Sequence, residues 1–142
     1  MKTAFLHFTL LVCSMFLCLS CSDEEVSSPI GYNLPQRFRI NVPDDTAIIA
    51  KSQADFDRLF QESAGELAEV DFDRYDLVYI QGASSSGIED LQAQWNLESI
   101  PYELSVRITY NLTAEYCVWS LAYLIAKSES NQVTASVVYT DH

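Results

Sequence analysis

Residues 102 to 110 read YELSVRITY, the most regular hydrophobic pattern in this chain of 142 residues. Polar residues at every second position separate the apolar ones, which are Tyr102, Leu104, Val106, Ile108 and Tyr110. Strict alternation is typical of a β-strand that has one face in a core and the other in water. We therefore predict a strand here, in a sheet with one hydrated face.

Two further segments follow this strand. Residues 118–127 are apolar on both faces, a composition that suits either a strand or a helix. Residues 133–139 alternate again after a Ser-Glu-Ser-Asn turn, with Val133 and Tyr139 at the two ends of the apolar side. Because this last segment needs a neighbour, we predict that 118–127 is a strand, and that it also pairs with 102–110.

The segments before residue 102 read mostly as strands as well. DLVYIQG, residues 76–82, is almost continuously apolar, as expected for a central strand that is covered on both faces. A turn is predicted at SSSG, residues 84–87. The next strand carries its apolar residues on one side and ends before Ile100-Pro101; these residues are Leu91, Ala93, Trp95 and Leu97.

The stretch SQADFDRLFQESAG, residues 52–65, is predicted as a helix. Ser52 can cap it, Asp55 favours the positive end of the helix dipole, and Gly65 can end it. Its apolar face carries Phe56, Leu59 and Phe60. Two short strands are predicted before the helix, at residues 37–42 and 46–51, on either side of a Pro-Asp-Asp turn.

Together these elements predict an α+β fold, with one helix packed on a mostly antiparallel sheet of five to seven strands. We expect a single domain over residues 37–142. Residues 21–36 contain serine, proline and glycine and are predicted to be an acidic, flexible tether. Residues 1–20 are predicted to be a signal peptide, because Lys2 precedes an apolar run that ends at Ser20. The run is shorter than the roughly 20 apolar residues that a membrane-spanning helix needs.

Cys21 follows Leu19-Ser20, and this arrangement resembles the lipobox of bacterial lipoproteins, in the looser form found in Bacteroidetes. Cys18 stands where leucine is usual. The resemblance implies that Cys21 is acylated and that a lipid anchor at this residue attaches the chain to a membrane. A secreted protein that is cut nearby is the alternative.

The acidic stretch at residues 22–25, SDEE, resembles the Bacteroidetes export tag. That resemblance implies an outer-membrane lipoprotein facing the cell surface, and periplasmic exposure stays open. The same residues also suit a solvated tether.

The charge and the cysteine content argue against a nucleic-acid-binding protein and against a disulfide-stabilised domain. The first 20 residues contain one lysine and no acid, so the remainder holds 20 acidic and 7 basic residues, a net charge of −13. Nucleic acid is a poor partner for such a chain, because phosphate binding depends on Lys and Arg. Once Cys21 is acylated and the signal is removed, Cys117 is the only free cysteine, so no internal disulfide is expected.

No catalytic residue, metal or cofactor is predicted. The only histidines are His7, within the signal, and His142, the last residue. Cys117 has no basic neighbour that would stabilise a thiolate and is read as a buried filler. Asp71, Asp73 and Asp76 faintly suggest a calcium loop, but the glycine and the distal glutamate of an EF-hand are absent. We therefore read this segment as a solvated loop, and whether it binds a cation stays open.

Two binding features stay open. Tryptophan or tyrosine side chains on the surface would suit a glycan-binding lipoprotein, although most of the aromatics fall on apolar sides of strands; the candidates are Trp95, Trp119, Tyr102, Tyr110 and Tyr123. Asp45-Thr46-Ala47 resembles a Bacteroidetes O-glycosylation site, which makes Thr46 a candidate acceptor.

Residues 48–138 resemble the protease-complex-subunit-B-like C-terminal domains and their lipoprotein relatives. The carrying residues are Phe56, Phe60, Val70-Asp71-Phe72 and Leu77 to Ile80. The resemblance implies a non-catalytic accessory domain that contacts a protease or another exported protein. We expect a binding module rather than an enzyme, with a protein partner that an exposed sheet edge can receive.

Overall fold

The computed structural model describes residues 27–141. Over this range the chain forms one α-helix, one 3₁₀ helix and seven strands. In chain order these are β1 (Ile30–Gly31), β2 (Ile48–Ala50), α1 (Gln53–Phe60), the 3₁₀ helix η1 (Gln61–Glu66), β3 (Tyr75–Ser84), β4 (Ile88–Asn96), β5 (Tyr102–Tyr110), β6 (Cys117–Ala126) and β7 (Val133–Thr140).

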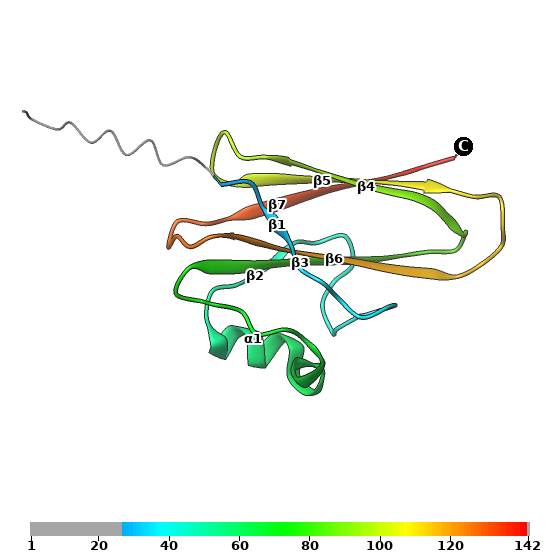
Figure 1. The fold of residues 1–142 in the computed structure, drawn as a ribbon. Coiled ribbons are helices and arrows are strands. Elements are labelled where there is room, and N and C mark those ends of the chain that lie inside the picture. Colours follow the sequence, from blue (N-terminus) through cyan, green and yellow to red (C-terminus); the bar gives the residue numbers. More distant parts are fainter. Residues whose placement is uncertain (1–26, 142) are drawn as a thin grey trace, which may run out of the picture.

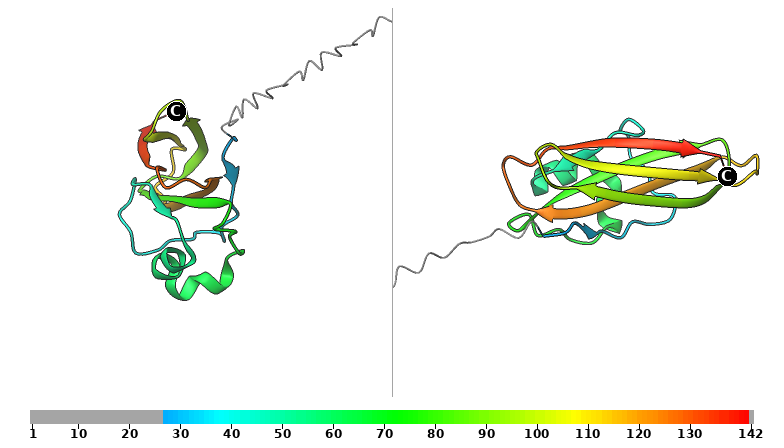
Figure 2. Two further views of the ribbon diagram at one scale, coloured as in Figure 1. Left: turned by 90° about the vertical axis from the view of Figure 1, so that its left-hand side faces the viewer. Right: turned by 90° about the horizontal axis from the view of Figure 1, so that it is seen from above.

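The strands form two stacked sheets, and α1 covers the outer face of one of them (Figure 1). The first sheet has the order β1-β6-β3-β2, and the second has the order β4-β5-β7. Every pair is antiparallel except β5 and β7. The α+β prediction is therefore confirmed, with the strands divided between two sheets. Figure 2 shows the resulting layers end-on and from above.

The layers explain why the strands differ in composition. β3 lies between α1 and the second sheet, so both of its faces are buried: Leu77 and Tyr79 join the core under the helix, whereas Ile80 joins the core between the sheets. β5 has only one covered face, and its polar residues point to water. The continuous apolar run at residues 76–82 and the alternation at 102–110 are both confirmed.

The strand at residues 118–127 is confirmed, but its predicted partners are wrong. β6 pairs with β3 from Tyr75↔Ala126 to Ser84↔Cys117 and lies in the first sheet. β7 pairs instead with β5, and in parallel. Two parallel neighbouring strands need a crossover connection between them. Between β5 and β7 that connection contains β6, which lies in the first sheet. β6 is apolar on both faces because it too lies between the helix and the second sheet.

Residues 37–42 do not form the predicted strand. The buried side chain of Gln81 occupies the place that a neighbouring strand would take: its Oε1 accepts from the N–H of Ile40 at 3.0 Å, and its Nε2 donates to the carbonyl of Val42 at 2.9 Å. Phe38 still enters the core under the helix. The alternation at residues 37–42 thus marks a segment with one buried face, but this segment does not pair with another strand through backbone hydrogen bonds.

Two predicted boundaries also differ. The α-helix ends at Phe60 rather than at Gly65, because Gln61 adopts a positive φ of 42° and the chain continues as η1. The domain begins before residue 37: Ile30 and Gly31 form β1, and the side chain of Tyr32 is 9% exposed. Residues 30–36, predicted as tether, therefore pack on the first sheet. Ser52 caps α1 as expected, and its Oγ accepts from the Asp55 N–H.

Candidate functional site

One side of β6 is largely open. Ile30 pairs with Leu124 and Gly31 with Tyr123, and the Tyr32 N–H donates to the carbonyl of Ala122 at 2.8 Å. Among the described residues, no other strand lies on this side of β6. Successive residues of a strand direct their backbone groups to alternate sides. Val118 and Ser120, like Ala122, therefore point their N–H and C=O groups away from β3, and residues 118–121 form an open sheet edge.

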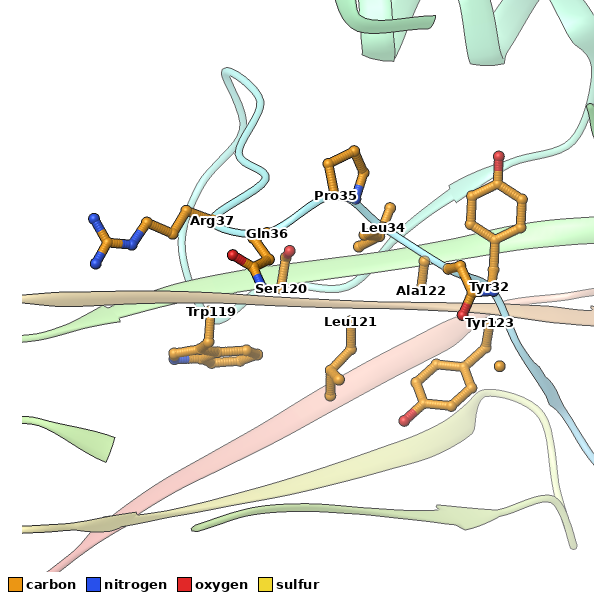
Figure 3. A pocket seen from close by; sticks show the side chains of 12 residues that line it. Tyr32, Leu34, Pro35, Gln36, Arg37, Trp119, Ser120, Leu121, Ala122 and Tyr123 are labelled. Carbon is orange, nitrogen blue, oxygen red and sulfur yellow. The ribbon is translucent and has the colours of Figure 1, made fainter. Parts of the chain in front are cut away.

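A hollow of about 440 Å³ follows this edge (Figure 3). Residues 31–37 form one wall and residues 119–123 of β6 form the other, and we call this feature the β6 groove. Figure 3 shows Trp119, Leu121 and Tyr123 on the side of β6 that faces the second sheet, whereas Ser120 lies on the side of residues 34–36. The groove thus combines backbone polar groups with apolar side chains.

The outer wall of the β6 groove is held at both ends. The Tyr32 hydroxyl donates to the carbonyl of Ala68, and burial raises the pKa of Tyr32. Phe38, just beyond the wall, is buried against Phe60 and Tyr79. Exposed residues between these anchors include Gln36 and Arg37. This geometry suits an extended chain that lies along β6, because such a ligand can satisfy the open backbone groups and bury alternate side chains.

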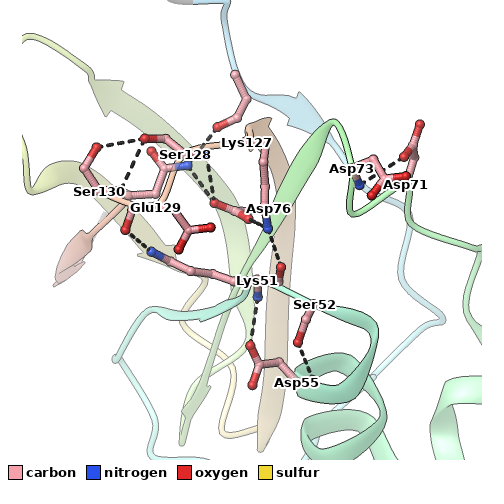
Figure 4. Close-up of polar contacts among 12 residues, drawn as sticks. Lys51, Ser52, Asp55, Asp71, Asp73, Asp76, Lys127, Ser128, Glu129 and Ser130 are labelled. Carbon is pink, nitrogen blue, oxygen red and sulfur yellow. Dashed lines mark hydrogen bonds and ion pairs between the residues drawn. The ribbon is translucent and has the colours of Figure 1, made fainter.

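A buried polar network connects the loop after β6 to the start of β3 and to Lys51, beside α1 (Figure 4). Asp76 is fully buried. Its Oδ1 accepts from the Lys127 ammonium at 2.8 Å and its Oδ2 from the Asn131 amide at 2.8 Å. Lys127 also donates to the carbonyl of Lys51, and the Lys51 ammonium donates to the carbonyl of Glu129 at 2.8 Å. The Asp76 carboxylate is therefore paired and hydrogen-bonded, as a buried charge requires.

The three acids of the suggested calcium loop do not come together. Asp71 and Asp73 are exposed, and the Asp71 Oδ1 accepts from the Asp73 N–H at 3.2 Å, which closes a turn. Asp76 lies inside the fold and faces Lys127. Within residues 27–141 no group of three or more His, Cys, Asp or Glu side chains is placed to hold a metal ion.

Other candidate residues occupy varied positions. Cys117, read from the sequence as a buried filler, is half-buried at the start of β6. Trp119 is buried, and its Nε1 donates to the Tyr139 hydroxyl at 3.3 Å. Trp95 is half-buried, and its ring meets Tyr123 edge-on. Thr46 is exposed in the loop before β2. Cys21 lies outside the described residues.

The outer face of the second sheet has a smaller hollow, of about 240 Å³. Register places Gln94, Ser105 and Ser136 in one row across the sheet, and Gln92, Arg107 and Val138 in the next. Within this sheet Arg107 is the only basic residue, and it forms no ion pair with a described residue. This surface offers amide, hydroxyl and guanidinium groups to a polar ligand.

Sequence reasoning missed the β6 groove and the Asp76–Lys127 pair. Asp76 and Lys127 stand at the ends of two apolar runs, a signal that could have suggested a buried ion pair. In the described part of the chain, no helix is long and apolar enough to cross a membrane. Comparisons of the chain with known protein families, with curated proteins and with solved structures found no match.

Proposed function

We propose that this chain is a lipid-anchored binding module without catalytic activity, displayed on the outer membrane and facing the cell surface, which contacts another envelope or exported protein. The open edge at residues 118–121, beside the β6 groove, carries the proposal. An extended segment of the partner adds to this edge as a further strand. Lipid attachment at Cys21 and association with a protease are supported by the sequence resemblances alone.

Proline at position 120 tests strand addition. Ser120→Pro removes an N–H that faces the open edge, a position at which a strand tolerates proline. Ala135→Pro is the matched control, because the Ala135 N–H also faces a free edge, that of β7. The Tyr102 N–H donates to the carbonyl of Gln132, so Gln132 directs its backbone groups toward β5. Backbone groups alternate along a strand, and those of Ala135 therefore point to the other side. Circular dichroism and thermal unfolding establish that both variants fold.

The measurement is a pull-down from solubilised outer membrane with the full lipoprotein as bait. We expect an envelope protein to co-purify with the wild type and with Ala135→Pro, and to be lost with Ser120→Pro. Failure to capture any protein, or equal capture by both proline variants, contradicts the proposal.

Metabolic labelling tests the anchor. Cells that receive labelled palmitate should incorporate it into the wild type and into Cys117→Ser, but not into Cys21→Ser. A mature, unlabelled protein in the medium would contradict membrane attachment. This result would leave the β6 groove to be tested on its own.

Glycan binding is the second candidate, favoured by the polar hollow on the second sheet. Trp119 is buried and Trp95 is half-buried, so neither tryptophan forms an exposed platform for a sugar. The tryptophans therefore do not support glycan binding. Amide and guanidinium groups around Ser105 can instead bind sugar hydroxyls. Screening the domain on a glycan array should show binding that Arg107→Ala abolishes and Arg74→Ala does not. An array without signal removes this candidate.

A further inference from the structure

The loop between β5 and β6, residues 111–116, exposes two large apolar side chains. Leu112 is 94% exposed and Tyr116 is 70% exposed. Single apolar residues on a surface are ordinary, but these two lie on one six-residue loop at one end of the sandwich (Figure 1). We call residues 111–116 the tip loop.

Hydrogen bonds to Gly87 hold the tip loop in place. The Asn111 N–H donates to the Gly87 carbonyl at 2.9 Å, and the Gly87 N–H donates to the Thr113 carbonyl at 3.1 Å. The Asn111 side chain accepts from the Thr113 N–H at 3.2 Å. A β-carbon at position 87 would collide with the side chains of Asn111 and Thr113, so glycine permits this approach. Leu112 is therefore presented outward by an ordered backbone, which lowers the entropy lost when a partner binds.

The strand ends and loops beside the tip loop are acidic. Residues 84–90, 109–117 and 139–141 contain no lysine or arginine. They contain four acids, which are Glu89, Asp90, Glu115 and Asp141. The exposed Arg37 lies apart from these segments, in the wall of the β6 groove beside Trp119 and Ser120. An apolar side chain with an acidic rim is complementary to an apolar pocket with a basic rim. The same acids oppose contact with an anionic lipid surface.

The tip loop also lies far along the sandwich from the start of the described chain. Ile30 pairs with Leu124, near the end of β6, whereas the tip loop directly precedes Cys117 at its beginning. Figure 1 shows β1 and the yellow segment after β5 toward opposite ends of the strands. In a chain that is anchored through its N-terminus, the tip loop therefore lies toward the end of the domain that is farther from the attached end of the chain.

We propose that the tip loop docks on a partner protein, with Leu112 inserted into an apolar pocket whose rim carries Lys and Arg. This inference rests on the proposed function, since it names the chemistry of the protein partner. Tyr116 and Glu115 contact the rim, and the partner's segment on the β6 groove continues from there, because Cys117 joins the tip loop to the open edge.

Photo-crosslinking in intact cells tests the inference with the full lipoprotein. Benzoylphenylalanine replaces Ala114, an exposed residue of the tip loop, and in a second strain replaces Gln36 in the wall of the β6 groove. Adducts are quantified by immunoblot, and the cross-linked peptide is mapped by mass spectrometry. Leu112→Ser and Glu115→Lys are combined with the Ala114 probe. The controls are Ile100→Ser, an exposed apolar residue at the opposite end, and Glu66→Lys in η1.

We expect a protein adduct from position 114 that maps to a Lys- or Arg-rich surface of the partner. Leu112→Ser should reduce its yield about tenfold or more, as the loss of one buried leucine predicts. Glu115→Lys should also reduce the yield, and both controls should leave it unchanged.

An adduct from position 36 without one from position 114, or an adduct that Leu112→Ser does not affect, overturns the tip-loop inference and leaves the proposed function standing. Adducts from position 114 with lipid only, or with a second copy of this chain, overturn it as well. The absence of adducts from both positions overturns both proposals.

Discussion

The side chain of Lys127 keeps a fully buried carboxylate stable in the interior. Asp76 accepts from it at 2.8 Å and is otherwise held by amide groups, among them the Asn131 side chain. The Lys127 side chain itself is 26% exposed, so it is removed from water less completely than Asp76 is. The cost of breaking this pair therefore depends on which partner is removed, since only Asp76 would be left as an isolated buried charge.

Lys127→Met should lower the free energy of unfolding by about 3 kcal/mol, because it leaves Asp76 buried without a cation. Arg58→Met is the matched control, since it breaks an ion pair with Asp55 whose side chains are 71% and 34% exposed. Its effect should stay at about 0.5 kcal/mol or below. Urea denaturation measures both values, and equal losses would contradict the role assigned to Lys127.

Tyr79 makes the fold sensitive to alkali. Burial raises its pKa to about 12 from 10.0. Because the unfolded side chain loses its proton first, the stabilisation is complete below pH 10 and is lost as the pH rises from 10 toward 12. Tyr79→Phe should therefore unfold with a weaker pH dependence than the wild type in this range. Thermal unfolding in alkaline buffers measures it, with Tyr116→Phe, an exposed hydroxyl, as the control that should match the wild type.

At the level of elements, the helix α1 was predictable because its signals are local. Ser52 accepts from the Asp55 N–H at 3.1 Å, and Phe56 and Phe60 point into the core. The alternation of β5 and the continuous apolar run of β3 are similarly properties of the strands themselves. Residues 37–42 were mistaken for a strand because a side chain, Gln81, bonds to their backbone in place of another strand.

The N-cap of α1 should contribute measurably to stability. Ser52→Ala removes an acceptor for one of the free N–H groups at the helix start and should cost about 1 kcal/mol. Ser85→Ala, in an exposed turn, provides a control with little expected effect. Chemical denaturation compares the two variants. A change of similar size at position 85 would show that loss of any serine hydroxyl, rather than capping, is responsible.

Asp55 makes the stability of the fold depend on pH in the acidic range. The hydrogen bond from Arg58, and then that from the Lys51 N–H, lower its pKa below 3.8. The ionised carboxylate therefore stabilises the fold above pH 3.8, and this contribution is lost as the pH falls through the lowered value. Asp55→Asn should be less stable than the wild type near neutrality, and the difference should vanish in strong acid. A difference that is constant with pH would argue against this assignment.

At the scale of the whole molecule, residues 30–36 are part of the folded domain and not of a tether before it. Tyr32 and Leu34 pack under the helix, and β1 extends the first sheet. The same segment forms the wall of the β6 groove. Its docking thus couples the stability of the domain to the shape of the candidate binding site.

A chain that begins at residue 37 should be less stable than one that begins at residue 27. Loss of the buried Tyr32 ring alone is expected to cost about 3 kcal/mol, the lower end of the range for deleting a large aromatic from a core. Thermal unfolding of the two truncated chains measures the difference. Tyr32→Ala in the longer chain separates the contribution of ring packing from that of β1 pairing. Equal melting temperatures for the longer chain, the shorter chain and Tyr32→Ala would support the interpretation of residues 30–36 as a tether.

The sequence by itself determined the helix α1 and the strands β2 to β7, because periodicity and capping depend on residues a few positions apart. The proposed lipid anchor also rests on the sequence alone, since Cys21 and its neighbours resemble a local motif.

Tertiary structure alone decided the sheet that each strand joins, the parallel pairing of β5 with β7, and the open edge of β6. These features arise between residues far apart in the chain, as Asp76 and Lys127 are. An apolar face specifies that a strand is covered but does not specify which layer covers it, because hydrophobic burial is not directional.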